Sequence, residues 1–414
     1  MGDMKIDTIV IGGGPAGMMA AGRAAERGKH VLLLEKNSTL GKKLLITGGG
    51  RCNVTNNKPH IRTLASKYKK NDKFLFSAFS QFGVKDAFSF FESRGLPLVV
   101  QARKRAFPHT EKSLDVYTTL LKYLQAGKVK IISDSPVTKI NTQGNKISSV
   151  LCGKNEYAAD SFILATGGVS HPETGSTGDG FGWLKKLGHT VSNPTPTIVP
   201  LAVADEWIKE LAGVSLSFMK ITFFGEGKKK FSKTGKILFT HFGLSGPLIL
   251  NSASQVDDLL YDGAVTATID AYPDTDLGAL EKKIISVFDK NKNKMLKNVF
   301  KDIAPEGTAV SILSLLEDTV PSDTKVHSVT KEQRKRIVHL LKALPVTITG
   351  LMGFDRAVVA DGGIPLSEID TKTMRSKKIE NLFITGDLLH IIRPSGGYSL
   401  QLCWTTGFVA GNNA

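Results

Sequence analysis

Three glycines near the N-terminus have the spacing that binding of a dinucleotide phosphate requires. Gly12, Gly14 and Gly17 form a G-x-G-x-x-G pattern between an apolar run at residues 6–11 and an Ala- and Met-rich segment that ends near residue 27. In a strand–turn–helix unit the first glycine permits a tight turn, the second lets the backbone approach a pyrophosphate, and the third lets the helix pack closely on the strand. The helix N-terminus adds unpaired N–H groups and a partial positive charge. The residues expected at the dinucleotide are Gly12, Gly14, Pro15, Ala16 and Gly17.

An acidic residue follows this unit where a ribose ligand is expected. A second apolar run at 30–34 ends on Glu35, which lies 18 residues after Gly17. A carboxylate at this place can bind both hydroxyls of an adenosine ribose, and it would repel a 2′-phosphate. The pattern therefore predicts FAD or NAD, rather than NADP, as the bound dinucleotide.

The stretch LLITGGGRCNVTNN at 44–57 favours FAD over NAD. In a plain NAD dehydrogenase the chain would continue into further helices and strands, whereas this loop is too rich in glycine and asparagine to be the next helix. Successive glycines let main chain pass close to a flat ring, and its amides can hydrogen-bond ring heteroatoms. Such an extended segment is expected in the glutathione-reductase-like FAD fold. The residues assigned to the flavin here are Gly48, Gly49, Gly50, Arg51 and Asn53.

Two later stretches supply further contacts to the same cofactor. A strand at 156–168 ends in Ala-Thr-Gly-Gly, a common form of the second dinucleotide contact in such folds. Another strand ends at Asp387, whose carboxylate is placed to bind a ribitol hydroxyl. A glycine pair then opens a helix whose N-terminus can stabilise negative charge on the N1/O2 edge of the flavin. The residues assigned from these stretches are Thr166, Gly167, Gly168, Gly386, Asp387, Gly396, Gly397 and Tyr398.

Six motifs together resemble the YhiN/BaiN-like flavoproteins, the group that includes aminoacetone oxidase. They are GGGPAG, GKKLLITGGGRCNVTN, LATGG, PTPTIVPL, LFTHFGLSGP and ITGDLL…SGGYSLQ, and the likeness runs from residue 7 to 411. The resemblance implies bound FAD, an FAD domain built from both chain ends, and an inserted middle domain. It also implies that Val137 presents its backbone to the adenine, and that Lys36, Lys43 and Thr47 line the pyrophosphate or the flavin.

The chain departs from that family at several positions. Lys42 stands where the family often has an arginine, and Asp387 stands where a glutamate is frequent. The turn before Gly396 is usually acidic in the family, whereas HIIRPS places His390 and Arg393 there. What the acidic groups do near the flavin is therefore not carried over to this chain.

Sequence patterns predict an α/β fold, with a glutathione-reductase-like Rossmann domain at 1–190 and 346–414 and an inserted domain at 191–345. Three prolines in VSNPTPTIVPLAV prevent regular helix, and alternating segments such as SLSFMKITFFG and TGKILFTHFG predict antiparallel strands of a β-barrel-like part at about 191–270. From residue 277 to 345 apolar residues recur at helical spacing, and Thr330 is expected to cap a second helix. PVTITGLMGFDRAVVADGGIP is expected to return the chain to the first domain.

Proton-transfer residues are less well defined than the cofactor contacts. His171, His241 and His390 are the candidates, and His171 ranks first because it follows the Thr-Gly-Gly contact. Each of them is more often a structural histidine than a catalyst. His241 and Ser245 lie four residues apart, which could indicate a histidine-activated nucleophilic serine, but no acidic partner is recognisable in the sequence.

Composition sets broad limits on partners and compartment. Lys and Arg number 54 against 38 Asp and Glu, a net charge of +16, which we interpret as a lysine-rich solvated surface, with nucleic acid as an unlikely partner. The three cysteines are far apart, which argues against a disulfide framework or a metal site and fits a reducing cytoplasm. Acidic residues at 3 and 7 argue against an export signal, and no membrane segment is expected. The sequence gives no indication of oligomeric state.

These observations favour an FAD-dependent oxidoreductase that positions a small-molecule substrate against flavin N5 for hydride transfer. No second G-x-G-x-x-G follows a strand, so NAD(P)H is expected to bind only transiently as the electron donor. We favour a reductase. A flavin amine oxidase similar to aminoacetone oxidase, which would pass electrons to oxygen, is the main alternative. An RNA-modifying flavoprotein and a non-catalytic flavin sensor are the remaining ones.

Overall fold

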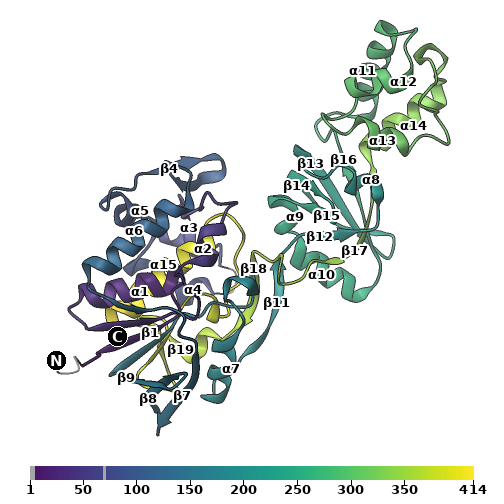
Figure 1. The fold of residues 1–414 in the computed structure, drawn as a ribbon. Coiled ribbons are helices and arrows are strands. Elements are labelled where there is room, and N and C mark those ends of the chain that lie inside the picture. Colours follow the sequence, from purple (N-terminus) through teal and green to yellow (C-terminus); the bar gives the residue numbers. More distant parts are fainter. Residues whose placement is uncertain (1–4, 69–70) are drawn as a thin grey trace. The chain divides into compact units, whose positions relative to one another are not determined.

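A computed structural model describes residues 5–68 and 71–414, which form two compact units (Figure 1). Unit 1 comprises residues 1–195 and 358–414, so both chain ends contribute to it, and unit 2 comprises residues 196–357. Each unit has its own apolar core.

Unit 1 is built on a seven-stranded sheet in the order β19-β20-β21-β10-β1-β2-β6. Five of its strands run parallel: β1 (Thr8–Ile11), β2 (Val31–Leu34), β6 (Lys130–Ile132), β10 (Ser161–Leu164) and β21 (Leu382–Ile384). The edge strands β19 (Ile369–Asp370) and β20 (Arg375–Ser376) are antiparallel. β1, β2 and β10 read TIVI, VLLL and SFIL and are buried throughout, as expected of parallel strands that are covered on both faces. The expected α/β Rossmann-type class is therefore confirmed.

Further elements surround this sheet. The helices of unit 1 are α1 (Pro15–Glu26), α2 (Lys42–Ile46), α3 (Ile61–Ala65), α4 (Asp72–Gln81), α5 (Val84–Glu92), α6 (Ser113–Ala126), α7 (Asp179–Lys186) and α15 (Tyr398–Asn413). One small antiparallel sheet has the order β3-β5-β4, with β3 (Thr55–Asn56), β5 (Arg105–Pro108) and β4 (Leu98–Gln101). Another contains β7 (Val137–Gln143), β8 (Lys146–Cys152) and β9 (Asn155–Ala158).

The first and last long helices of the chain, α1 and α15, pack so closely that glycines of α15 lie against the backbone of α1. A Cβ atom at Gly407 would overlap the carbonyl oxygen of Ala16, and one at Gly411 would overlap that of Ala20. Only glycine lets α15 approach so closely, because any side chain at these two positions would enter the backbone of α1. This contact joins the two ends of the chain.

Unit 2 is a closed six-stranded barrel with helices inserted before its last strand, which confirms the expected barrel-like part of the fold. Around the barrel the strands are β12 (Leu201–Val203), β15 (Gly243–Ser245), β14 (Lys228–Thr240), β13 (Ser215–Gly225), β16 (Val265–Asp270) and β17 (Leu344–Leu351). The helices between β16 and β17 are α11 (Leu277–Lys290), α12 (Leu296–Val299), α13 (Ala309–Ser314) and α14 (Lys331–Lys342). Thr330 caps α14, because its side chain accepts a hydrogen bond from the Gln333 amide (3.2 Å).

The segment at 344–351 differs from its sequence interpretation. We expected the chain to return to the first domain at 346, but β17 pairs with both β16 and β12 and closes the barrel. The alternation of buried and exposed residues along LPVTIT is that of a barrel strand. The units therefore divide at 195 and 358 rather than at 190 and 346. Near these divisions β11 (Ser192–Ile198) and β18 (Val359–Gly363) form a two-stranded sheet.

No helix within the described residues is both long and apolar enough to cross a membrane.

Replacing Gly407 tests the contact between α1 and α15. We expect Gly407→Val to lower the free energy of unfolding by about 1–3 kcal/mol or more, because the added carbons would force the two helices apart. Urea unfolding followed by circular dichroism measures the change. Gly182→Ala in α7 is the matched control, because a Cβ atom there meets nothing within 4 Å and alanine favours helix. Equal stability of Gly407→Val and the wild type would contradict the prediction.

Candidate functional site

Two of the three glycines of the first motif, Gly12 and Gly17, occupy positions that no other residue could fill. Gly12 has φ +104°, and a Cβ atom on it would lie 2.6 Å from the Ala165 carbonyl oxygen. A Cβ atom on Gly17 would overlap the Gly12 carbonyl, so this glycine lets α1 start directly on the end of β1. Gly14 precedes α1 as its N-cap, and a Cβ atom there meets nothing within 4 Å. The N-terminus of α1 is thus open to an anionic group.

Glu35 lies beside this turn and is buried. Its carboxylate accepts hydrogen bonds from the Gly13 amide (2.7 Å) and from the backbone and side-chain nitrogens of Asn37 (2.8 Å each). The Ser135 amide donates to the Glu35 carbonyl (2.9 Å), which brings the start of β7 at Val137 next to this segment. The structure therefore places the predicted ribose and adenine contacts side by side.

The three-glycine loop that follows α2 has an unusual backbone. Gly48, Gly49 and Gly50 have φ values of +59°, +67° and +84°, a left-handed run that only glycine adopts without strain. Cβ atoms on Gly49 and Gly50 would meet nothing within 4 Å, so these two residues face open space. The loop closes on Thr47, whose carbonyl accepts from the Gly50 and Cys52 amides at 3.1 and 3.0 Å. Burial raises the pKa of the Cys52 thiol to about 12, which agrees with a packing role.

Asn53 ties this loop to the start of α15. Its side-chain oxygen accepts from the Gly397 amide (3.0 Å), and its nitrogen donates to the Thr55 carbonyl (2.9 Å). The Asn56 side chain donates to the Gly396 carbonyl (3.1 Å). A Cβ atom on Gly397 would lie 2.5 Å from the Thr55 carbonyl oxygen, so this glycine is required for the close contact with β3. Two stretches more than 300 residues apart in sequence thus form one surface.

A charged cluster adjoins the predicted second dinucleotide contact. The Lys43 ammonium lies 3.6 Å from the Asp387 carboxylate and 3.4 Å from the Ser170 carbonyl. Arg393 forms an ion pair with the other oxygen of Asp387. Burial alone would raise the pKa of Asp387, but Arg393 and Lys43 lower it below its ordinary value, so the carboxylate stays ionised. Gly168 packs on Asp387, where a Cβ atom would lie 3.4 Å from the Asp387 Cβ.

Two of the predicted cofactor residues are held by other protein groups. The Lys36 ammonium donates to the Thr177 hydroxyl (2.5 Å) and to the Asp179 carboxylate (2.8 Å) at the start of α7. Arg51 pairs with Glu111 (2.8 Å), and its guanidinium carbon lies 4.4 Å from the centre of the Phe107 ring. Their assignment to the pyrophosphate or flavin remains a prediction.

The three candidate histidines occupy different places. His171 directly follows Ser170, which Lys43 contacts, and its Nδ1 lies 2.8 Å from the Glu173 carboxylate. The backbone of His390 accepts a hydrogen bond from the Asn71 side chain (3.3 Å). His241 belongs to unit 2. Two of the candidates therefore share unit 1 with the predicted cofactor residues, and His171 lies next to the charged cluster.

The groups gathered here fit FAD. The N-terminus of α1 and the glycine loop offer backbone with open space in front of it, and Glu35 and Asp387 are carboxylates that can bind hydroxyl groups. The Thr166 hydroxyl is buried and has no hydrogen-bond partner among the described residues, as expected of a group that a cofactor satisfies. Gly167 beside it has φ +73°.

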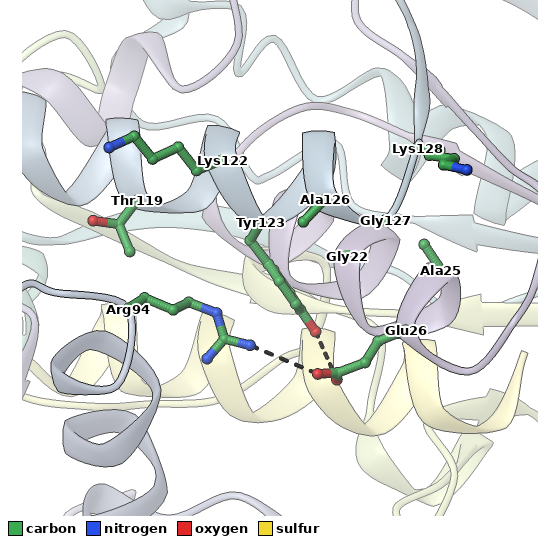
Figure 2. A pocket seen from close by; sticks show the side chains of 10 residues that line it. All are labelled: Gly22, Ala25, Glu26, Arg94, Thr119, Lys122, Tyr123, Ala126, Gly127 and Lys128. Atoms are coloured by element: carbon green, nitrogen blue, oxygen red, sulfur yellow. Dashed lines mark hydrogen bonds and ion pairs between the residues drawn. The ribbon is translucent and has the colours of Figure 1, made fainter.

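A hollow lies at the C-terminal end of α1, away from the predicted cofactor residues (Figure 2). Its walls are formed mainly by the last turns of α1 and α6, and Arg94 and Tyr123 both reach Glu26 across it (3.6 and 3.0 Å). The Arg94 guanidinium also lies over the Tyr123 ring. These groups satisfy one another, and we interpret them as a structural link between the helices. The lining residues are Gly22, Ala25, Glu26, Arg94, Thr119, Lys122, Tyr123, Ala126, Gly127 and Lys128.

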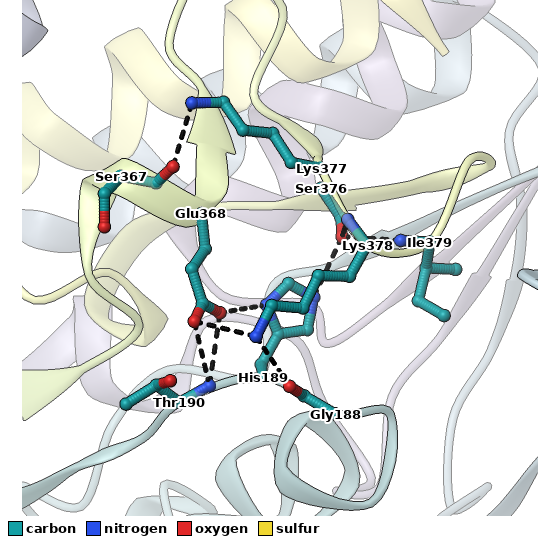
Figure 3. Close-up of polar contacts among 9 residues, drawn as sticks. All are labelled: Gly188, His189, Thr190, Ser367, Glu368, Ser376, Lys377, Lys378 and Ile379. Carbon is teal, nitrogen blue, oxygen red and sulfur yellow. Dashed lines mark hydrogen bonds and ion pairs between the residues drawn. The ribbon is translucent and has the colours of Figure 1, made fainter.

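Sequence analysis missed a buried serine–histidine–glutamate arrangement in unit 1 (Figure 3). His189 Nδ1 lies 2.7 Å from the Glu368 carboxylate, and its Nε2 lies 2.9 Å from the Ser376 hydroxyl. The amides of residues 378 and 379 both donate to the Ser376 oxygen, at 3.0 and 2.9 Å. Because those donors occupy its lone pairs, the hydroxyl proton must point to Nε2, so His189 is neutral and carries its proton on Nδ1. Ser376 is buried and has no capacity to attack a substrate, so the arrangement is a structural clamp.

The fold and site define the class of protein: it is a flavin-dependent oxidoreductase with an FAD-binding Rossmann-type domain. The chain belongs to the family described as the HI0933-like protein Rossmann domain, whose model matches residues 6–413. This match confirms the resemblance to the YhiN/BaiN-like flavoproteins.

Curated relatives cover nearly the whole chain. A 3-dehydro-bile acid delta(4,6)-reductase of Clostridium scindens is 29% identical over 98% of this chain and 98% of its own length. A ribosomal RNA dihydrouridine synthase of Haemophilus influenzae is 26% identical over 97% of this chain and 96% of its own.

Solved structures share the fold at low sequence identity. The 3-ketosteroid-delta4-(5alpha)-dehydrogenase of Rhodococcus jostii matches with a TM-score of 0.55 at 14% identity, covering 99% of this chain and 97% of that one. The 3-ketosteroid delta1-dehydrogenase of Sterolibacterium denitrificans matches with a TM-score of 0.54 at 12% identity, covering 99% of both chains.

The clamp around His189 makes a testable contribution to the pH dependence of stability. Burial lowers the pKa of His189 below its ordinary value of 6.5 more than Glu368 raises it. His189 therefore takes up a proton more readily in the unfolded chain than in the native protein. The free energy of unfolding consequently falls as the pH drops below about 6.5. We expect the urea midpoint to fall less between pH 7.5 and 5.5 in His189→Gln than in the wild type.

The exposed His60 provides the matched control, because His60→Gln removes a solvated histidine from the same unit. That variant should keep the pH dependence of the wild type. A His189→Gln protein with an unchanged loss of stability between the two pH values would refute the assignment.

Proposed function

We propose that this protein is a reductase that uses FAD to saturate a C=C bond conjugated with a carbonyl group. The observation that carries the proposal is the whole-length similarity to two relatives whose names both describe reduction. One name specifies double bonds of an oxidised bile acid, and the other specifies a uridine that has gained two hydrogens. In both substrates the reduced bond is conjugated with a carbonyl, which makes its far carbon an acceptor for hydride.

FAD supplies hydride transfer at N5 when it is bound. The chain's own groups would hold it: the α1 N-terminus at the diphosphate, Glu35 at a ribose, and Asp387 at the ribitol. A hydride would add to the carbon β to the carbonyl and a proton to the α carbon, while NAD(P)H is oxidised to NAD(P)⁺. His171 is the first candidate to deliver the proton, since it adjoins the charged cluster of Lys43 and Asp387.

Anaerobic reduction of the bound flavin tests the electron donor and the direction. We expect NADPH or NADH to bleach the visible flavin band promptly, and a 4-ene-3-ketosteroid or a uridine-containing RNA to restore it with formation of the saturated product. Equal concentrations of free FAD form the control for direct reduction. Bound FAD that resists NAD(P)H but is bleached by aminoacetone would overturn the proposal and favour an amine oxidase.

A specific feature supports RNA as a second candidate substrate: the distribution of charge. Unit 1 carries 33 Lys and Arg against 19 Asp and Glu, whereas unit 2 carries 21 against 19. The excess is therefore on the unit with the predicted flavin residues and not on the lysine-bearing inserted domain. Phosphate groups of a polynucleotide are the natural counter-charges for such a surface.

Part of this charge lies beside the predicted flavin loop. The tip of the hairpin between β4 and β5 carries three consecutive cations, at 103–105, and the Arg105 Nε atom lies 3.6 Å from the Cβ position of Gly396. Burial and then the charges of Arg103 and Arg51 lower the pKa of Arg105. Burial and the nearby Lys67 and Lys104 likewise lower the pKa of Lys58. These cations repel one another, and an anionic ligand bound beside them would reduce that repulsion.

The salt dependence of RNA binding separates the two candidate substrates. The triple variant Arg103→Gln/Lys104→Gln/Arg105→Gln should bind RNA more weakly and reduce the slope of log affinity against log salt by about 1–3, if the tip contacts one to three phosphates. Lys228→Gln/Lys229→Gln/Lys230→Gln removes the same charge from unit 2 and should leave the slope unchanged. Equal slopes for the wild type and the hairpin variant would exclude the hairpin tip as the RNA contact. Absence of salt-dependent RNA binding by the wild type, with steroid reduction intact, would exclude RNA and leave the small-molecule reductase.

A further inference from the structure

Arg393 is almost completely buried, with 1% of its side chain exposed. Each of its three nitrogens has a partner: Nε donates to the Ser399 hydroxyl (3.0 Å), Nη1 donates to the Ile391 carbonyl (2.8 Å), and Nη2 binds the Asp387 carboxylate. An arginine is rarely buried so deeply unless its geometry is fixed by such partners. Three of its five N–H groups are therefore bound by protein groups and its side chain is buried, so Arg393 acts mainly on its neighbours.

Those neighbours belong to two different elements of the predicted flavin site. Asp387 lies in the short 3-10 turn η6 (Gly386–Leu388) after β21, and Ser399 lies in the first turn of α15. Asp387 is the residue expected at the ribitol, and the start of α15 is expected at the N1/O2 edge of the flavin. One planar guanidinium thus fixes the ribitol ligand relative to the helix N-terminus.

The cluster around Arg393 also carries a surplus of positive charge. Arg393 and Lys43 face the carboxylate of Asp387, and Lys43 also interacts with the carboxylate of Glu173, whose side chain is 58% exposed. Burial raises the pKa of the neighbouring Cys403 thiol to about 12 and that of the Tyr68 phenol well above its ordinary value, so both stay neutral. Among the side chains here that are less than a quarter exposed, two cations face one carboxylate, beside the N-terminus of a 16-residue helix that adds positive charge.

We infer that Arg393 is a positioning residue for the flavin, which locks Asp387 to the start of α15 and whose buried charge raises the reduction potential of bound FAD. Two-electron reduction gives the flavin negative charge at its N1/O2 edge, and a fixed cation nearby stabilises the reduced form over the oxidised one. The inference depends on FAD binding and not on the direction of catalysis or on the substrate.

Three substitutions separate the geometric role of Arg393 from its charge. Arg393→Met removes both, Arg393→Lys keeps the charge but loses the planar fork, and Ser399→Ala keeps the charge and removes one anchor. Arg27→Met, at an exposed arginine after α1, is the matched control for loss of a charge from the same unit. The dissociation constant of FAD from apoprotein and the midpoint potential against a reference dye are measured for each.

We expect Arg393→Met to bind FAD at least tenfold more weakly and to disfavour the reduced flavin by at least a further tenfold, a shift of about 30 mV to more negative potential. Arg393→Lys should keep a potential near that of the wild type but bind FAD more weakly. Ser399→Ala should leave the potential unchanged.

A potential that is the same in Arg393→Met and the wild type would overturn the inference about charge. If Arg393→Met fails to fold, Arg393→Lys still decides the question. A lysine variant with unchanged FAD affinity would refute the positioning role, and one with a strongly lowered potential would refute the role of the charge. A protein that reduces no substrate but shows the expected potentials would contradict the proposed function and leave this inference intact.

Discussion

The close approach of backbone to backbone at α1 is the constraint on which the rest of unit 1 depends. Gly17 lets α1 begin directly against the end of β1, and Gly407 and Gly411 let α15 pack against the backbone of the same helix. Because α15 ends the chain, this packing brings residues from both termini to one place. The α1 N-terminus, the glycine loop and the start of α15 can form a common surface only because no side chains separate these helices.

Buried charge is the second organising element, and each of two buried or half-buried carboxylates is kept ionised by the cations and hydrogen-bond donors around it. Asp387 remains ionised because two cations face it, and Glu368 has its pKa lowered to about 2 because hydrogen bonds from Lys378, Thr190 and His189 outweigh the effect of burial. A buried carboxylate without such partners would take up a proton. The two clusters have different roles. The cluster at Asp387 lies among the predicted cofactor residues, whereas the cluster at Glu368 holds loops together.

Much of the fold and the cofactor class follows from local sequence patterns. The glycine spacing at 12–17, the apolar strands on either side and the acidic residue at 35 all lie within one βαβ unit, so each constrains the next over a few residues. The barrel strands of unit 2 are likewise visible as alternation. The domain boundaries do not follow from local patterns: β17 comes after some 70 residues of helical and connecting chain, and only its pairing with β16 and β12 shows that it belongs to the barrel.

What the sequence by itself determined is the phosphate-binding turn, the choice of a flavin-type dinucleotide fold, and the presence of an inserted domain. Tertiary structure alone decided which distant groups meet. Ser376 and His189 are 187 residues apart, and Asn53 reaches Gly397 across most of the chain. Local sequence patterns predict backbone conformation because φ, ψ and the periodicity of burial are set by near neighbours in the chain. Contacts between remote side chains form only once the helices and strands have packed.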